Sequence, residues 1–200
     1  MAALSRIEPL PQVMNPYAGD DVGALVRRRN LRLYGEWLAA ERPSVLLLGE
    51  AVGYRGGRLT GVPFVSEQIM LTHPLFGAAR GYVKTAEWPT ICREATATIM
   101  WQTLDACGVY QALWNVFPFH PHRPGQMASN RQPTVAELAW GEDFVRMLLV
   151  LLPIETIVAV GNMAEMALQR WGLPCVKVRH PSHGGKRAFQ AGVTKVLWGE

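Results

Sequence analysis

Residues 49–64 are the part of the chain whose composition most directly suggests ligand binding. Five of these sixteen residues are glycine, so the backbone can pass close to a bound molecule. The glycine spacing matches neither the P-loop nor the dinucleotide-binding fingerprint. Glu50 supplies the one carboxylate of the segment, and Phe64 offers an aromatic face on which a planar ligand could stack. A surface loop that needs glycines for its turns is the structural alternative.

Histidines and cationic side chains gather in a few other short segments. Four of the five histidines form two pairs, His120 with His122 and His180 with His183. Imidazoles can transfer protons or bind metals, but no Asp, Glu or Cys lies directly beside either pair, so we expect no metal site. Cationic residues accompany both pairs and the glycine-rich segment, namely Arg55, Arg58, Arg123, Arg131, Lys186 and Arg187. This clustering favours a ligand with phosphates, although a coding bias toward arginine would also raise the arginine count.

Short apolar runs precede these polar groups and are typical of buried parallel strands. They cover residues 44–49, 110–117, 156–161 and 175–179. Helical patterns cover residues 20–40, 87–107, 134–152 and 162–171, and Thr134 with Glu137 has the spacing of a capping box. The alternation predicts an α/β fold, a three-layer α/β/α sandwich around a central four-stranded, mainly parallel sheet. Because loops that follow parallel strands share one edge, we expect Glu50, Asn115 and His180 along that edge.

The composition predicts a single soluble domain over residues 1–200, with residues 1–19 as an extended N-terminal arm. Hydrophobic residues make up 49% of the chain and charged residues 18%, which allows a sizeable core. The longest apolar run, residues 147–154, is far shorter than the roughly 20 residues that span a bilayer. The net charge of +4 permits a polyanionic partner without requiring one.

Cysteine usage and the N-terminal residues bear on the cellular compartment. Cys92, Cys107 and Cys175 are scattered without CxxC spacing, which favours small buried residues in a reducing cytoplasm over disulfides or a metal cluster. The first residues lack the basic and apolar regions of a secretory signal. We therefore expect a cytoplasmic protein, without membrane association, that acts as a monomer.

In their order along the chain, several motifs resemble those of the uracil-DNA glycosylase superfamily. Gly49-Glu-Ala-Val-Gly53 is similar to the Gly-Glu-Ala-Pro-Gly motif of its iron–sulfur branch, with Val52 in place of proline. The matches run from about residue 44 to 190, and the ordered set is more specific than any one of them. The further matching segments are Gly61-Val-Pro-Phe64, Asn115, Asn130-Arg131-Gln-Pro133-Thr134 with Glu137, Gly161-Asn-Met-Ala164, and His180-Pro181-Ser182.

The resemblance implies a role for each matching residue. Phe64 would stack on the base, the Asn115 amide would read the pyrimidine edge, and His180 would hydrogen-bond O2 of uracil, where negative charge develops. The backbone N–H groups around Ala51 and Val52 could add to this stabilisation. A base inside a duplex must first be flipped out of the stack. An Asn at a strand end can instead be a turn or cap residue, and His-Pro is common in loops.

The sequence departs from the superfamily pattern at three points. Prototypical members orient the attacking water with an aspartate where this chain has Ala51, so Glu50 is the remaining carboxylate of the loop and is assigned to positioning water or base. Gly53 stands where those members use tyrosine to exclude the thymine methyl group. The cluster cysteines of the iron–sulfur branch are missing, so we expect no cofactor and no cluster.

The last predicted loop, residues 183–189, lies where the superfamily inserts a wedge into the duplex, and His183, Arg187 and Phe189 stay open as the wedge. The expected DNA contacts are Arg55, Arg123, Arg131, Ser182, His183, Lys186 and Arg187. Neutralising Arg187 or Arg123 should weaken DNA binding, whereas changing Arg27 should have little effect.

The resulting hypothesis is a monofunctional uracil-DNA glycosylase of base excision repair, a hydrolase that leaves an abasic site in uracil-containing DNA. No catalytic lysine suggests a lyase step. The alternatives are a glycosylase for another deaminated or oxidised base, a non-catalytic DNA or abasic-site binder, and an unrelated nucleotide-binding enzyme.

Overall fold

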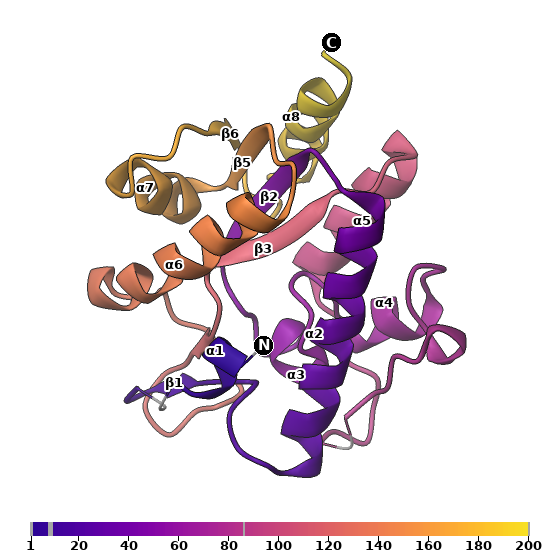
Figure 1. Ribbon diagram of the computed structural model, residues 1–200, viewed down its shortest axis with the longest axis vertical. Helices are drawn as coiled ribbons and strands as arrows, with labels where there is room; N and C mark the ends of the chain where they lie inside the picture. The colour runs from indigo at the N-terminus through magenta and orange to yellow at the C-terminus, as the bar shows by residue number, and fades with distance from the viewer. Residues whose placement is uncertain (1, 8–9, 86, 200) are drawn as a thin grey trace. The chain divides into compact units, whose positions relative to one another are not determined.

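The computed structural model describes residues 2–7, 10–85 and 87–199, and it divides the chain into two compact units (Figure 1). The unit called here the sheet unit comprises residues 38–50, 98–118 and 133–200. The other, called the loop unit, comprises residues 1–37, 51–97 and 119–132. That residues 1–200 act as one domain stays a prediction. None of the helices among the described residues is long and apolar enough to cross a membrane.

The sheet unit is built on the predicted four-stranded sheet. Its strands are β2 (Val45–Ala51), β3 (Ala112–Phe117), β5 (Thr156–Val160) and β6 (Val176–Val178), in the order β3-β2-β5-β6. The sheet is parallel, and Val45 of β2 pairs with Thr156 of β5. Leu46, Leu47 and Leu48 are fully buried, because strands covered on both faces need apolar side chains at successive positions.

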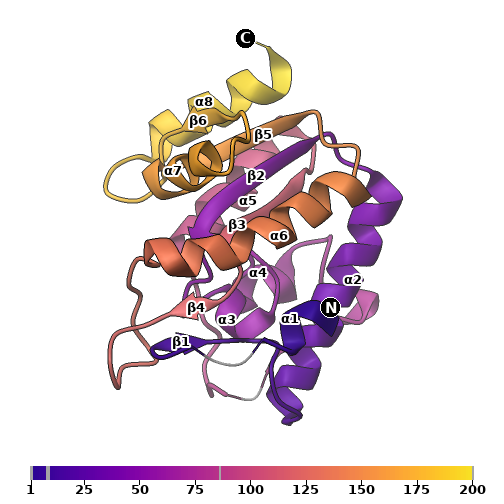
Figure 2. The same cartoon turned by 60° about the vertical axis from the view of Figure 1, so that its left-hand side comes forward.

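Helices cover both faces of this sheet, as the predicted three-layer sandwich requires (Figure 2). They are α5 (Ala95–Cys107), α6 (Val135–Leu151), α7 (Asn162–Arg170) and α8 (Lys186–Trp198). Right-handed crossovers place α6 and α7 on one face and α5 on the other. Thr194 of α8 contacts Cys107 of α5 at 3.6 Å, so α8 shares the face of α5.

Local sequence explains where α6 and α5 begin. The α6 helix has the predicted capping box, in which Thr134 and Glu137 each bond the backbone N–H of the other. The prediction that a helix starts at residue 87 is wrong, because α5 begins at Ala95. Pro89 disfavours a helical conformation at Trp88, and the carboxylate of Glu67 holds the Cys92 N–H at 2.8 Å.

The end of the chain also differs from the prediction. Residues 186–189 were expected to belong to a loop, but they form the first turn of α8. The helix follows a tight turn, in which Gly184 has a φ of +74° and a Cβ on Gly185 would lie 2.0 Å from the carbonyl oxygen of His180. No side chain caps the start of α8, so the capping signal that helps to locate helices in a sequence is missing here.

Short elements and long connections make up the loop unit. Its elements are α1 (Ala2–Ser5), β1 (Val13–Met14), the first four turns of α2 (Val22–Glu41), α3 (Gly57–Thr60), α4 (Glu67–Thr72), the 3-10 helix η1 (Ala78–Arg80) and β4 (His120–Pro121). Strands β1 and β4 pair antiparallel. Asp21 caps α2, since its Oδ1 accepts the Ala24 N–H at 3.0 Å. Within residues 1–19, Tyr17 is buried and donates its hydroxyl to the Gly61 carbonyl at 3.0 Å.

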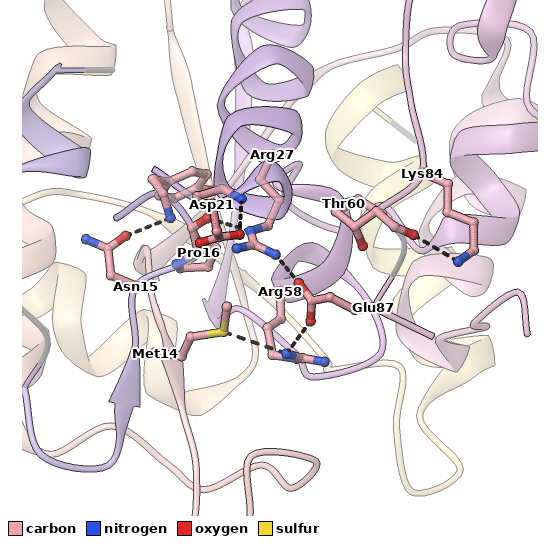
Figure 3. A network of polar contacts seen from close by, with 12 residues as sticks. Met14, Asn15, Pro16, Asp21, Arg27, Arg58, Thr60, Lys84 and Glu87 are labelled. Atoms are coloured by element: carbon pink, nitrogen blue, oxygen red, sulfur yellow. Dashed lines mark hydrogen bonds and ion pairs between the residues drawn. The ribbon is translucent and has the colours of Figure 1, made fainter. Parts of the chain in front are cut away.

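An ion-pair network with two buried arginines and a partly exposed carboxylate joins distant parts of the loop unit (Figure 3). The Glu87 carboxylate pairs with Arg27 of α2 through one oxygen and with Arg58 of α3, at 3.0 Å, through the other. The two arginines are only 3% and 4% exposed. Arg27 also donates to the Pro16 carbonyl at 2.5 Å. Breaking a buried pair of this kind leaves an uncompensated charge, so the network holds α2, α3 and the segment around Glu87 together.

Candidate functional site

Three candidate residues occupy the carboxyl edge of the parallel sheet, as the topology predicted. Glu50 is near the end of β2, Asn115 is in the second half of β3, and His180 follows β6 by two residues. All three belong to the sheet unit. Ligands of open parallel sheets bind outside this edge, so it is the first place to look for chemistry.

The Asn115 side chain is buried yet has spare hydrogen-bonding capacity. It is 4% exposed, and within the described part of the chain its amide neither donates nor accepts a hydrogen bond. An amide has both a donor and an acceptor side, so Asn115 can bind a ligand edge that presents the complementary pair.

The hydrogen bonds of His180 fix which ring nitrogen carries its proton. The backbone N–H of Ser182 donates to Nδ1 at 3.1 Å, and the Ser182 hydroxyl lies 2.7 Å from the same nitrogen. Because the backbone N–H can only donate, Nδ1 accepts, and the proton of the neutral ring resides on Nε2. Burial, followed by the charges of Arg179 and His183, lowers the pKa of His180. At neutral pH the ring is therefore a neutral imidazole that offers Nε2–H as a donor.

Glu50 places a carboxyl group on the same sheet edge. Its side chain is partly buried, and burial raises the pKa of this carboxyl. Among the described residues, no side chain or backbone group donates a hydrogen bond to it. Glu50 is thus able to bind water or a ligand donor.

The backbone of Val52 is occupied by contacts within the loop unit. Its N–H donates to the Phe119 carbonyl at 3.2 Å, and its carbonyl oxygen lies 2.8 Å from Nδ1 of His120. The expectation that the Val52 N–H stabilises a bound base is therefore wrong, because this donor is already used. His120 is fully buried, and its Nε2 lies 3.0 Å from the Met127 carbonyl. His120 therefore anchors the loop that follows β2 to the segment around Met127.

Phe64 has an unusual backbone conformation for a bulky residue. Its φ is +54°, in the left-handed region that disfavours side chains with a Cβ. Strained positions of this kind cluster at ligand sites and persist where neighbouring contacts hold them. Here the Thr60 hydroxyl donates to the Val65 carbonyl at 2.7 Å, and Val65 N–H bonds Val62. The Phe64 ring is 7% exposed, so only a small part of it reaches the surface.

The cationic residues divide into exposed and buried groups. Arg55, Arg123, Lys186 and Arg187 are exposed, as is His183, and Ser182 is partly buried. Arg131 is partly buried and donates to the carbonyls of Gln12, His122 and Gln132. Arg58 lies in the buried network with Glu87, which removes it from the cationic surface that its position in the sequence suggested.

Two sequence expectations about exposed residues are wrong. Phe189 is fully buried in α8, so of the three wedge candidates only His183 and Arg187 are exposed. His183 has a φ of +50° in the turn that precedes α8. Arg27 is 3% exposed, so changing it would disturb the fold and it cannot serve as a neutral surface control.

Sequence reasoning missed one carboxyl group, that of Glu94. A Cβ on Gly53 would lie 2.0 Å from its Oε1, and a Cβ on Gly56 would lie 2.1 Å from its Oε2. The carboxyl therefore fills the space beside two glycines of the glycine-rich segment. Burial raises the pKa of Glu94 to about 7. The predicted helix over residues 87–107 concealed this residue, and Pro89 was the signal against that helix.

Metal-binding groups do not gather in the described part of the chain, where no three His, Cys, Asp or Glu side chains could hold an ion together. Cys92 and Cys107 are buried, as predicted, whereas Cys175 is partly exposed. The chemistry open to the described residues is hydrogen bonding, proton transfer and stacking.

Comparisons with known proteins identify the fold. The chain is an α/β protein with a four-stranded parallel sheet flanked by helices. No protein-family model and no curated protein matches it. Among solved structures, it resembles the crystal structure of wild-type Pedobacter heparinus SMUG2, with a TM-score of 0.65 at 14% sequence identity. The match covers 95% of this chain and 89% of that one, so the likeness extends over nearly the whole fold.

Proposed function

We propose that the protein is a monofunctional DNA glycosylase that hydrolyses the N-glycosidic bond of uracil in DNA and leaves an abasic site. The observation that carries the proposal is the buried Asn115 amide, which has no partner within the described residues, on the same sheet edge as a neutral His180. The likeness of fold to SMUG2 supports the proposal beside the sequence motifs that resemble the uracil-DNA glycosylase superfamily.

Recognition of uracil is assigned to Asn115 and Phe64. Uracil presents an N–H donor next to a carbonyl acceptor, and an amide can pair with both. Cytosine reverses this pattern and would leave buried polar groups unpaired, which is the strongest way for a site to reject an analogue. Phe64 is proposed to stack on the flipped base, and Ala51 and Val52 to line it.

Stabilisation of the leaving group is assigned to His180. When the C1′–N1 bond breaks, the electron pair moves onto uracil and negative charge develops at O2. The Nε2–H of a neutral imidazole can donate to that oxygen, and Ser182 holds the ring in the required tautomer through Nδ1. Donors aimed at developing charge typically contribute about 10²–10³-fold in rate. Water adds to C1′, and Glu50 is proposed to position the water or the base.

DNA binding is assigned to the exposed cations and to the turn before α8. Arg55, Arg123, Lys186 and Arg187 are exposed and can neutralise phosphates. Arg131 and Ser182 are proposed to reach the backbone with fewer free donors, because both already bond within the chain. His183 and Arg187 are the candidates for the wedge. We further propose that the protein acts in the cytoplasm as a monomer.

The proposal is tested with oligonucleotides that carry one uracil, hypoxanthine, xanthine or thymine, followed by alkali treatment. We expect alkali-labile cleavage at uracil and its loss in Asn115→Ala and His180→Ala. Cleavage only at another base would show that the protein is a glycosylase for that base and not for uracil. Tight binding without cleavage of any substrate would contradict the glycosylase function and favour a non-catalytic DNA binder.

A further inference from the structure

The glycine-rich segment holds a carboxyl group that comes from elsewhere in the sequence. Glu94 fills the positions that side chains would take at both Gly53 and Gly56, where an added Cβ would lie about 2 Å from Oε1 and Oε2 respectively. Separations below 3.0 Å essentially never occur for real Cβ atoms, so the carboxyl group can keep its present place only while both positions are glycine.

The segment that carries Glu94 is fixed by contacts within the loop unit. The Cys92 N–H donates to the Glu67 carboxylate at 2.8 Å, and the Gln68 N–H donates to the Cys92 carbonyl at 3.1 Å. On the other side, the Gly56 and Arg58 N–H groups both donate to the Gly53 carbonyl. Hydrogen bonds of the backbone thus hold both the segment just before Glu94 and the loop that receives its carboxyl group, which favours a specific arrangement over an incidental contact.

Glu94 is suited to accept a proton near neutral pH. Burial raises the pKa of its carboxyl to about 7. A general base works best when its pKa is near the working pH, because it is then both ionised and basic enough. Four charged groups act on Cys92, two residues before Glu94, namely Arg55, Arg58, Glu67 and Lys84, and the exposed Arg93 directly precedes Glu94. Two of them are satisfied by partners, since Lys84 pairs with Glu67 at 3.1 Å and Arg58 pairs with Glu87.

We propose that Glu94 is the general base that activates the attacking water, an inference that rests on the glycosylase function proposed above. The water oxygen forms a bond to C1′, and the C1′–N1 bond breaks with its electron pair moving to uracil. The water proton passes to the Glu94 carboxylate, and the uracil anion leaves. The Gly53–Gly56 cradle holds the carboxylate in the loop that directly continues β2.

Glu50 is the other carboxylate that could accept the proton. The two carboxyl groups differ in their surroundings. Glu50 is on the strand itself, and no side chain or backbone group among the described residues donates a hydrogen bond to its carboxyl. Glu94 is built into the loop, and two glycines are needed to admit it. We therefore assign proton acceptance to Glu94 and leave Glu50 with the positioning of water.

The first test is the pH profile of single-turnover uracil excision for wild type, Glu94→Gln and Glu50→Gln, with the exposed Glu36→Gln as control. The ionised form of Glu94 is active, so the wild-type rate should rise from pH 5 to pH 8 with a midpoint near 7. At pH 8 the excision rate of Glu94→Gln should be at least about 100-fold lower than that of wild type, and its pH profile should lack the midpoint near 7. Glu50→Gln should be slower but keep the midpoint, and Glu36→Gln should match wild type.

A Glu94→Gln rate within about threefold of wild type at pH 8 would overturn the proposal, as would an unchanged midpoint. A wild-type protein that releases no uracil would instead contradict the glycosylase function itself. DNA affinity is measured for every variant. If Glu94 has only a structural role, Glu94→Gln should weaken DNA binding and leave the pH profile of excision unchanged. That result would also overturn the proposal.

A second test displaces the carboxylate without changing it. Gly53→Ala would place a Cβ 2.0 Å from Oε1, whereas nothing lies within 4 Å of a Cβ on Gly35 in α2. Gly53→Ala should lower the rate at least about 10-fold and add nothing to Glu94→Gln, because both changes remove the same function. Gly35→Ala should leave the rate unchanged. Full activity of Gly53→Ala, or additive losses, would overturn the proposal.

Discussion

The sheet unit and the loop unit position their functional groups in different ways. In the sheet unit, Glu50 and Asn115 are on strands and His180 follows one, so the parallel ladder sets their places. In the loop unit, Phe64 and Glu94 are placed by contacts between separate loop segments, such as the packing of Glu94 against Gly53 and Gly56 and the bond from Thr60 to Val65.

Because of this difference, we expect the residues of the sheet edge to affect the reaction and the residues of the loop unit to affect folding stability. The Asn115 amide makes no bond to the described residues, so removing it should cost activity and little else. The loop unit depends on the buried charges of Arg27 and Arg58, which both pair with the carboxylate of Glu87. Substitutions at the sheet edge should therefore change the rate of excision, whereas substitutions in the loop unit should change the free energy of unfolding.

Asn115→Ala should give the largest effect on chemistry. We expect uracil excision to slow by about 10²–10³-fold, as for loss of a key polar group in a site. The melting temperature should stay within about 2 °C of wild type, because the variant removes an amide that has no partner among the described residues. The exposed Gln169→Ala near the end of α7 is the matched control and should excise uracil at the wild-type rate. A large loss of stability in Asn115→Ala would contradict the division between the units.

Glu87→Gln should give the largest effect on stability. It leaves two guanidinium groups, of Arg27 and Arg58, buried without a carboxylate (Figure 3). We expect a loss of about 3 kcal/mol in the free energy of unfolding, measured by chemical denaturation. Glu36→Gln removes a surface pair with Arg32, whose side chain is 65% exposed, and should cost less than about 1 kcal/mol. Equal losses for the two variants would show that the buried network does not hold the loop unit.

Glu94→Gln should lose activity and gain stability. The pKa of Glu94 is about 7 in the folded chain against a reference value of 4.5, so the folded state binds the extra proton between these values. Stability is then lost as the pH rises from 4.5 through 7, since ionisation of the desolvated carboxyl opposes folding. Replacing the carboxyl by a neutral amide should raise the unfolding free energy at pH 8 by about 1–3 kcal/mol. Little change is expected at pH 5, and equal changes at both pH values would contradict the assignment.

Arg187→Gln should give the smallest effect and act on DNA binding alone. Arg187 is exposed on the first turn of α8, so its loss should reduce the slope of log affinity against log salt by about 1. Arg170→Gln at the end of α7 is an exposed control that should leave the slope unchanged. Binding of both variants is measured by fluorescence anisotropy at several salt concentrations. If the salt dependence of affinity is unchanged in both variants, Arg187 does not contact DNA phosphates.

Local sequence patterns predicted the sheet unit well. Apolar runs locate β2, β3, β5 and β6, because buried parallel strands need them, and the capping box locates the start of α6. The order of strand ends then predicted that Glu50, Asn115 and His180 share one edge. These features depend on residues close together in the chain, which a single sequence displays directly.

The loop unit could not be predicted in the same way, because its arrangement depends on contacts between distant residues. Glu87 lies 60 residues from Arg27 and 29 from Arg58, so nothing local marks these arginines as buried. Glu94 was concealed by an apolar periodicity that continues into α5, while the bond between Cys92 and Glu67 spans 25 residues. Strained backbone, as at Phe64, leaves no mark on the sequence either.

The most direct test of the central claim is the release of free uracil, quantified by mass spectrometry, from single-stranded and duplex oligonucleotides with one dU. Under single-turnover conditions, we predict one uracil released per oligonucleotide by the wild-type protein, and release at least about 100-fold slower for Asn115→Ala and for His180→Ala. A folded wild-type protein that releases no uracil from either substrate, or an Asn115→Ala variant as fast as wild type, would contradict the account.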